Sequence, residues 1–366
     1  MASVQSLLGR HGLDALIVYS DAGNAANVRY LTNHRPFFGP GLLVVRAGGS
    51  SVLINRFNWD APRAKLESGL DSVLSGFATA DLVRESLRNL AIASHGRLGL
   101  AGGDLIPHRL YCEVFGDRAG EDRVDITAEY EKLRLTKSEV EQQFLRAAAE
   151  ITDAAIRALV AVTRRGTSER ELAATLEYEM KRRGADGLAF PASVASGPNT
   201  EKPVSLPSDR RLEPGDLVMV DVGATYQGYC ADITRTFVVG EPTARQREVH
   251  SAVSLALQAA TGHVQPGVAA SDLHRAAVQS LEESGLAQFF SHRVGHGIGL
   301  ETSLEAPDLQ RDGALLEPGM TFCLEPGVYI PGFGGIKIED DIVVQPGGPE
   351  VISTSPRDLV VVGDVT

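Results

Sequence analysis

The sequence predicts an α/β domain followed by an α+β domain that has a mostly antiparallel sheet. The length of 366 residues favours two domains, since a domain averages roughly 150 residues. The first third alternates apolar runs with helical patterns, which is typical of an α/β domain. Over the last 180 residues, glycine and proline separate short apolar runs, which favours an α+β domain. We therefore expect one domain over 1–130 and a second over 131–366.

Apolar runs and turn residues predict the elements of the N-terminal domain. One run ends at Tyr19 and predicts a buried strand, and two later runs flank Ala47-Gly48-Gly49, a turn signal that predicts a hairpin. Apolar residues then recur at helical spacing before a further strand. The expected elements are strands at 13–19, 41–46, 51–54 and 97–101 and a helix at 79–90.

The second domain is expected to open with two helices. Helical spacing of apolar residues runs from near Thr136 to Arg165-Gly166, where the glycine can end the helix. Ser168 and Glu171 form a capping-box pattern at the start of the next helix. The remaining expected elements are helices at 168–183, 243–262 and 270–284 and strands at 217–222, 234–239, 320–324, 335–338 and 342–344.

Composition excludes several classes of function. The net charge of −12 argues against a general nucleic-acid binder, which needs a basic face. No run of 18 apolar residues occurs, so no membrane-spanning helix is expected. Met1–Asp14 lacks the pattern of a secretory signal. The three cysteines, Cys112, Cys230 and Cys323, are odd in number and widely spaced, which favours reduced thiols and a cytoplasmic location.

Five residues stand out as candidates for chemistry. Asp221 lies inside an apolar strand pattern, where an unpaired carboxylate is costly to bury. Asp232 follows eleven residues later, after a glycine-containing turn, so that a hairpin can bring the two carboxylates together. Glycines flank His296 on both sides and permit close approach of the backbone. Glu325 and Glu339 are further carboxylates in apolar strand patterns.

Each of these residues alone has a purely structural explanation, such as a turn, a packed loop or a solvated strand end. Together, four carboxylates and one histidine suit two divalent cations. The four carboxylates carry a charge of −4 and the two cations a charge of +4, so a bridging hydroxide leaves the whole cluster with a charge of about −1. This mixed oxygen and nitrogen ligation favours Mn, Co, Fe or Zn over Ca. Two such ions, about 3.5 Å apart, would lower the pKa of a shared water and polarise a carbonyl group.

The order and flanks of these residues resemble the pita-bread metallohydrolases, which include prolidase, aminopeptidase P, methionine aminopeptidase and creatinase. The matching stretches are Asp221–Gly223, Asp232–Phe237, Gly295–Leu300, Glu325–Gly327 and Gly335–Asp340. Asn27–Thr32 is similar to the creatinase/prolidase N-terminal domain, and Leu133–Glu139 to the entry of the catalytic domain. The prolidase and aminopeptidase P branch fits better than methionine aminopeptidase, which lacks this N-terminal domain.

The resemblance implies a role for each residue. Asp221 would chelate one metal, Asp232 and Glu339 would bridge both, and His296 and Glu325 would complete the other. A metal-bound hydroxide would attack the carbonyl, and Glu325 would shuttle the proton from the bridging water to the leaving nitrogen. His292 would line the substrate pocket as a further catalytic residue. The implied reaction is cleavage of Xaa-Pro bonds in short peptides by a homodimer that uses two divalent ions, manganese first, with Co, Zn or Fe as alternatives.

Two histidines that are usual in peptidase members are absent. No histidine occurs from Arg109 to Val249, and Val204 occupies the expected place of the first one. The position expected for the second is Ser303. Lys337 replaces an arginine that is common before the last glutamate, which removes a bidentate fork. The resemblance implies that the first histidine would help to stabilise the tetrahedral oxyanion. Such a hydrogen-bond donor lowers the activation barrier by about 3 kcal/mol.

Three functions therefore remain open. The protein can be a prolidase-like peptidase that uses another donor, such as Tyr229, Lys337 or a backbone amide. It can instead be a creatinase-like hydrolase of a non-peptide C–N bond, or a metal-bearing binding protein without catalysis. Cys230 and Cys323 each lie two residues before a proposed ligand, hence on the same strand face. They either tune the ions or serve only as small apolar core residues.

Overall fold

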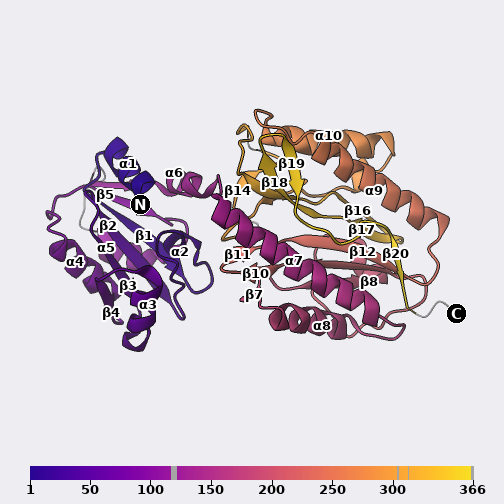
Figure 1. The fold of residues 1–366 in the computed structure, drawn as a ribbon, viewed down its shortest axis with the longest axis horizontal. Helices are drawn as coiled ribbons and strands as arrows, with labels where there is room; N and C mark the ends of the chain where they lie inside the picture. The colour runs from indigo at the N-terminus through magenta and orange to yellow at the C-terminus, as the bar shows by residue number, and fades with distance from the viewer. Residues whose placement is uncertain (117–121, 303–304, 312, 364–366) are drawn as a thin grey trace. The chain divides into compact units, whose positions relative to one another are not determined.

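The computed structural model describes residues 1–116, 122–302, 305–311 and 313–363. The chain divides into two compact units, Met1–Arg134 (unit 1) and Leu135–Thr366 (unit 2), each of which is visible in Figure 1. Within the described ranges, no helix has the length and apolar character needed to cross a membrane.

A six-stranded mixed sheet forms the centre of unit 1, in the order β4-β3-β2-β1-β5-β6. β2 and β3 form the expected hairpin, while β1 pairs antiparallel to β2 and parallel to β5. The strands are β1 (Ala15–Asp21), β2 (Pro40–Arg46), β3 (Ser51–Asn55), β4 (Val73–Ser75), β5 (Leu98–Ala101) and β6 (Arg123–Asp125). The helices are α1 (Ala2–His11), α2 (Ala26–Thr32), α3 (Ala61–Ser68), α4 (Thr79–Asn89), α5 (His108–Phe115) and α6 (Thr127–Glu131), with 3₁₀ turns at Asn58–Asp60 and Lys132–Arg134. The α/β prediction is confirmed.

Both faces of the sheet in unit 1 are buried. Leu16 and Val18 of β1 face one apolar cluster, whereas Ile17 and Tyr19 face the other, as the two-residue period of a strand requires. The predicted start of β1 at residue 13 is wrong by two residues. Gly12 ends α1 in the left-handed conformation, and the chain needs the next two residues to enter the strand.

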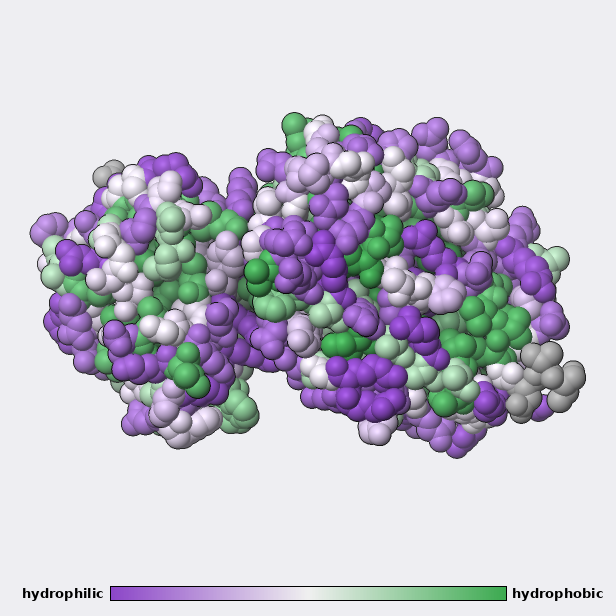
Figure 2. Space-filling view, in the orientation of Figure 1, coloured by the Kyte–Doolittle hydropathy of each residue, from purple (hydrophilic) through white to green (hydrophobic). Residues whose placement is uncertain are grey.

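Four helices form the outside of unit 2: α7 (Glu139–Val162), α8 (Glu169–Arg182), α9 (Ala244–Gly262) and α10 (Ala270–Glu283). The predicted capping box of Ser168 and Glu171 is confirmed, and Ser138 with Glu141 forms another that places the start of α7 at Glu139 rather than near Thr136. Figure 1 shows the α7–α8 pair and the α9–α10 pair on opposite sides of the strands, and hydrophilic residues predominate over the beginnings of α7 and α8 (Figure 2).

The strands of unit 2 are mostly antiparallel, as predicted. They form sheets in the orders β20-β12-β9-β8, β14-β13-β15-β18-β19, β11-β10-β7 and β16-β17. Their bounds are β7 (Gly187–Leu188), β8 (Ser193–Ser196), β9 (Leu217–Val222), β10 (Ala224–Tyr226), β11 (Tyr229–Cys230), β12 (Ile233–Val239), β13 (His296–Gly297), β14 (Glu305–Asp308), β15 (Thr321–Leu324), β16 (Gly327–Ile330), β17 (Gly334–Lys337), β18 (Asp340–Gln345), β19 (Gly348–Val351) and β20 (Val360–Val362). Short 3₁₀ turns occur at Gly197–Glu201 and Ala287–Phe289.

The core of unit 2 consists of two apolar clusters, one against α7 and α8 and the other against α9 and α10. On β9, Val220 and Val222 belong to the first cluster, while Leu217 belongs to the second. Because side chains alternate along a strand, Asp221 points away from the α7–α8 cluster. The sheet thus presents this carboxylate on the face where the cavity described below lies.

Candidate metal centre

The structure brings the five predicted ligands together around one cavity of about 420 Å³. Asp221 lies on β9, Asp232 precedes β12, His296 begins β13, Glu325 follows β15, and Glu339 lies between β17 and β18. All five side chains line the cavity, and all five residues are buried. Segments more than a hundred residues apart in sequence therefore converge on one buried polar cluster in unit 2.

Strand pairing explains how the carboxylates meet. Asp221 pairs with Thr234 across β9 and β12, so Asp232, two residues earlier on the same strand face, lies beside it. Leu324 pairs with Asp340 across β15 and β18, which sets the neighbours Glu325 and Glu339 opposite each other. The candidate centre is thus built from the ends of two antiparallel ladders.

The glycines around His296 are required by close backbone packing, as predicted. A Cβ atom on Gly295 would lie 1.9 Å from the carbonyl oxygen of Cys323, and one on Gly297 would lie 2.0 Å from that of Ala306. Both contacts are far shorter than atoms tolerate, so only glycine fits. This packing holds the short strand β13 against β15 and sets the imidazole in the cavity wall.

The donor atoms have the spacing that cation binding needs. His296 Nε2 lies 3.6 Å from Asp232 Oδ2 and 3.7 Å from Glu325 Oε1. His296 Nδ1 donates to the carbonyl oxygen of Gly297 at 3.0 Å, which leaves Nε2 as the acceptor that faces the carboxylates. Asp221, Asp232 and Glu339 offer oxygens that all lie within 4.8 Å of one another.

One orphaned atom also fits a bound cation. Asp221 Oδ1 is buried, and no hydrogen-bond donor reaches it within the described part of the chain. An unsatisfied carboxylate oxygen in such a place is costly unless a ligand completes it. The residues present therefore fit divalent ions, with Asp232 and Glu339 placed between the other ligands.

Lys337 is the one ammonium group that the structure places among these described carboxylates. Its Nζ lies 2.6 Å from Asp221 Oδ2, 3.3 Å from Glu325 Oε2 and 3.8 Å from Glu339 Oε2. Burial alone would lower the pKa of Lys337, but these carboxylates outweigh burial and raise its pKa well above the usual range. Lys337 therefore stays charged and offsets part of the negative charge.

The pKa values of the carboxyl groups shift in different directions within this one cavity. Burial raises the pKa of Asp232 well above its usual value, and the neighbouring carboxylates of Glu339 and Asp221 add to this rise. Burial likewise raises the pKa of Glu339 to about 8. Burial also acts to raise the pKa of Glu325, but Lys337 and the nearby histidines outweigh it and lower the pKa overall. Without ions, the cluster thus retains protons on some carboxyl groups.

A layer of polar groups behind the cluster was not predicted from the sequence. Thr234 Oγ1 donates to Glu339 Oε2 at 2.5 Å, and the backbone N–H of Asp232 donates to Asp341 Oδ2 at 3.0 Å. The buried Arg235 donates to the carbonyl oxygen of Glu339. A signal was present: Thr234 shares a strand face with Asp232, and an arginine inside the apolar run of β12 needs buried acceptors.

His292 lines the cavity, at the place that the sequence predicts. Its Nδ1 donates to the carbonyl oxygen of Arg293 at 2.8 Å, so its Nε2 accepts from the hydroxyl of Tyr329, also at 2.8 Å. Burial lowers the pKa of His292 below its usual value, so the ring is neutral near pH 7. The ring lies 3.9 Å from Glu325 Oε2.

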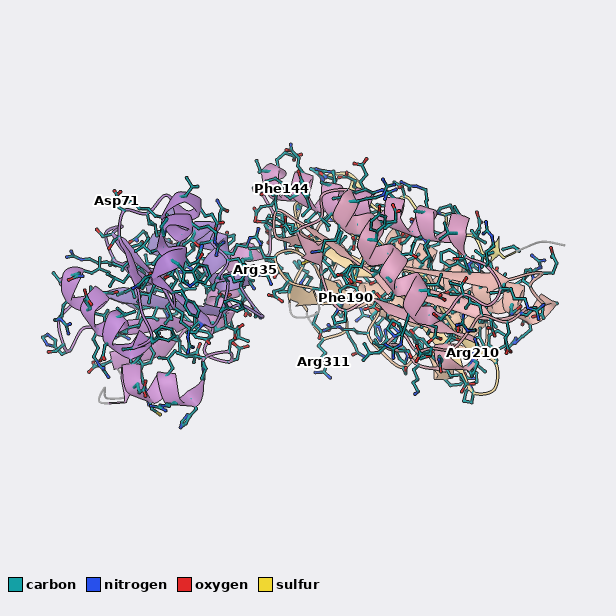
Figure 3. All side chains as sticks on the ribbon, turned by 90° about the horizontal axis from the view of Figure 1, so that it is seen from below. Arg35, Asp71, Phe144, Phe190, Arg210 and Arg311 are labelled. Atoms are coloured by element: carbon teal, nitrogen blue, oxygen red, sulfur yellow. The ribbon has the colours of Figure 1, made fainter. Side chains whose placement is uncertain are left out.

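One part of the cavity wall is apolar. It is formed by Phe190, which is labelled in Figure 3, together with Pro191, Pro203, Val204 and Leu206. Val204, in the place of the expected histidine, is 64% exposed, so this position is open to a substrate. The wall is therefore suited to an apolar group rather than to a charged one.

The two side-chain donors that were considered as substitutes for this histidine differ in position. Lys337 lines the cavity. Tyr229 donates its hydroxyl hydrogen to Glu141 at 2.9 Å and is not among the described cavity-lining residues, so the structure favours Lys337 over Tyr229 as the substitute donor. Ser303, the position of the second missing histidine, lies outside the described residues.

The fold and the buried cluster together define the class of two-domain pita-bread proteins, and comparisons with known proteins agree. The model of metallopeptidase family M24 matches residues 143–346, and that of the creatinase/prolidase N-terminal domain matches residues 1–136. The chain belongs to metallopeptidase family M24. The resemblance and the fold predicted from the sequence are thereby confirmed.

Individual relatives match over nearly the whole chain. The uncharacterized peptidase YqhT of Bacillus subtilis is 34% identical over 364 residues, 99% of each chain. The solved Xaa-Pro dipeptidase from Bacillus anthracis has a TM-score of 0.88 and 32% identity, covering 99% of this chain and 98% of the other. The X-Pro aminopeptidase from Thermotoga maritima has a TM-score of 0.89 and 32% identity, covering 99% of both.

Proposed function

We propose that this protein hydrolyses the amide bond before proline in short peptides, with two divalent ions held by Asp221, Asp232, His296, Glu325 and Glu339. The observation that carries the proposal is the convergence of these five buried side chains on one cavity in a member of this family. When bound, such ions lower the pKa of a shared water and polarise a carbonyl group.

The remaining residues of the cavity fit definite tasks. Glu325, with its depressed pKa, accepts a proton from the attacking water and passes it to the leaving nitrogen. Lys337 supplies a fixed positive charge near the oxygen that becomes negative. His292 stays neutral and orients the substrate. The apolar wall around Val204 accommodates the proline ring or an apolar neighbour.

Manganese is the first ion to test, with cobalt, zinc and iron as alternatives. The metal-loaded protein should be incubated with a panel of Xaa-Pro dipeptides and Xaa-Pro-Yaa peptides, and the products measured by mass spectrometry. We expect release of the residue before proline. Failure to cleave any peptide of the panel would overturn the peptidase proposal, and the relative rates separate a dipeptidase from an aminopeptidase.

A second candidate follows from the apolar Val204. Without the histidine, the site lacks one donor for a peptide oxyanion, which favours hydrolysis of a non-peptide C–N bond or binding without catalysis. Creatine-like compounds should therefore be included in the panel. Their cleavage, without cleavage of peptides, would select the creatinase-like function, whereas bound ions with neither activity would select a binding protein.

We also propose that the protein is a cytoplasmic homodimer. The described cysteines are all free, which fits a reducing compartment. In unit 1 the exposed rings of Phe37, Phe38, Trp59 and Phe77 gather around the half-buried Phe57, and an exposed apolar cluster of this kind supports self-association. Light scattering should give twice the chain mass of 39.0 kDa, and a monomer at micromolar concentration would overturn the dimer.

A further inference from the structure

Cys323 is a buried thiol that faces the candidate centre. It lies on β15 two residues before Glu325, so both side chains point to the same face of the strand. Its Sγ lies 3.6 Å from His296 Nε2. The sulfur also lies within 4.8 Å of ligand atoms of Asp232 and His296 and, as a second group, of Glu325 and Glu339.

These distances match those between ligands of one ion. With a metal–sulfur distance of about 2.3 Å and a metal–nitrogen distance of about 2.0 Å, the sulfur and nitrogen of two tetrahedral ligands lie about 3.5 Å apart. Around His296 Nε2, the sulfur of Cys323 is 3.6 Å away, Asp232 Oδ2 is 3.6 Å away and Glu325 Oε1 is 3.7 Å away. Of these donors, Cys323, His296 and Asp232 come from three different segments, and their ligand atoms all lie within 4.8 Å of one another.

Cys230 shows that a cysteine two residues before a proposed ligand does not always lie among the ligand atoms. It also lies two residues before a proposed ligand, Asp232, and is also buried. Its sulfur instead contacts Thr225 Oγ1 and the carbonyl oxygen of Gly228, each at 3.9 Å, and belongs to none of the described ligand groups. Cys230 is therefore a matched control for Cys323.

An independent observation indicates that the cavity is built for cations. Asp221 is nine-tenths buried, and its Oδ1 has no hydrogen-bond donor among the described residues. Asp221 also shares a ligand group with Asp232 and Glu339. Cys323 shares one ligand group with Asp232 and another with Glu339, so it lies beside the group that holds this unsatisfied atom and is not an isolated cysteine.

We propose that Cys323 is a thiolate ligand of the ion on the His296 side of the centre, an inference that rests on the metal site of the proposed function. On binding, the S–H bond of Cys323 breaks, a sulfur–metal bond forms, and the proton leaves to solvent. A soft sulfur ligand favours Zn²⁺ or Co²⁺ at this position. The ligands on the Asp221 side are all oxygens, which suit Mn²⁺. The two positions therefore differ in the metal ion that they prefer.

Cobalt titration of the ion-free protein tests the ligand directly. We expect a sulfur-to-cobalt charge-transfer band in the near ultraviolet that saturates at one equivalent of Co²⁺. The band should be present in the Cys230→Ser variant and absent in Cys323→Ser, with circular dichroism confirming that both variants fold. A band that persists in Cys323→Ser, or its absence from wild type that has bound cobalt, would overturn the proposal.

Metal competition supplies a second readout that does not depend on activity. Calorimetry of Cys323→Ser should show an affinity for Zn²⁺ lowered about tenfold or more, with the affinity for Mn²⁺ nearly unchanged. Equal losses for both ions would contradict a soft ligand. The two proposals fail separately: a wild type that binds no cobalt overturns the metal centre, whereas bound cobalt without the band overturns only the role of Cys323.

Discussion

Lys337 Nζ lies 2.6 Å from Asp221 Oδ2, inside a cavity that four carboxylates share. This pairing places a permanent positive charge next to a proposed ligand. The lysine is buried together with its partner, so both charges are largely shielded from bulk water. The ion-free protein therefore depends on this contact for its internal charge balance.

Lys337→Met should destabilise the ion-free protein by about 3 kcal/mol, because removal of one partner leaves a buried charge without compensation. Urea unfolding in the presence of a chelator measures the change. Added Mn²⁺ should reduce the difference from wild type, since cations then offset the carboxylates. Lys181→Met, at an exposed position on α8, is the control and should have little effect. Equal stability of Lys337→Met and wild type in chelator would contradict the prediction.

Asp232→Asn and Glu339→Gln should each remove most of the bound metal, because each of these carboxylates belongs to two of the described ligand groups and would bridge both ions. Elemental analysis after reconstitution and desalting should give about two ions per chain for wild type and fewer than one for either variant. Glu317→Gln, which removes an exposed carboxylate, should keep the wild-type content. Full occupancy in both bridging variants would rule out the assigned ligands.

Glu169 supports the loop that carries Val204 and should give the protein a pH-dependent stability. Its carboxylate accepts hydrogen bonds from the backbone and side chain of Ser196 and of Ser208, and from Asn199. Burial acts to raise the pKa of Glu169, but the hydrogen bonds from Ser208, Asn199 and Ser196 outweigh it and lower the pKa below 4.5. The unfolded chain therefore binds a proton at a higher pH than the folded one does.

The resulting stabilisation should be complete above pH 4.5 and should be lost as the pH falls through the lowered pKa of Glu169. Glu169→Gln should cost about 2 kcal/mol at pH 7, since the amide cannot accept all these hydrogen bonds. Chemical unfolding at several pH values should show that this cost shrinks below pH 4.5. Glu177→Gln, exposed on the same helix, is the control. A cost that is independent of pH would refute the assignment.

Local patterns were sufficient to predict residues that meet in one cavity but not the groups behind them. Asp221 and His296 lie in segments whose strand and glycine patterns are visible in the sequence, and the structure places both in one cavity. Arg235 and Asp341 act through pairing between distant strands, which no local period specifies. The run of acidic residues that ends at Asp341 has a solvated strand end as its ordinary explanation, yet all of it is buried.

The start of α7 is a second feature that local sequence patterns do not fully predict. The apolar period predicts a long helix from near Thr136, but Ser138 caps it and Thr136 instead bridges to Met320. The cap could be predicted from Ser138 and Glu141, which carry the same pattern that was used for Ser168. The bridge could not, because its partner lies far away in the sequence. Tertiary pairing therefore decided the boundary.

Val204→His should raise peptidase activity, because it places a hydrogen-bond donor in the apolar part of the cavity wall. Val204 lines the cavity and is 64% exposed, so an imidazole can be accommodated without disturbing the core. An oxyanion donor contributes about 3 kcal/mol, although a donor placed without its supporting contacts recovers less, so we expect an increase in kcat of about tenfold with little change in KM. Steady-state kinetics on an Xaa-Pro dipeptide measures both constants.

Leu206→His is the matched control for Val204→His, since Leu206 lines the same wall and is 72% exposed but does not occupy the expected position of the histidine. It should leave kcat near the wild-type value. A similar gain in both variants would indicate a general effect of a polar wall rather than a specific donor. If Val204→His changes neither constant while wild type cleaves the peptide, Lys337 already supplies the charge that the oxyanion needs, because it is the described ammonium group that lines this cavity.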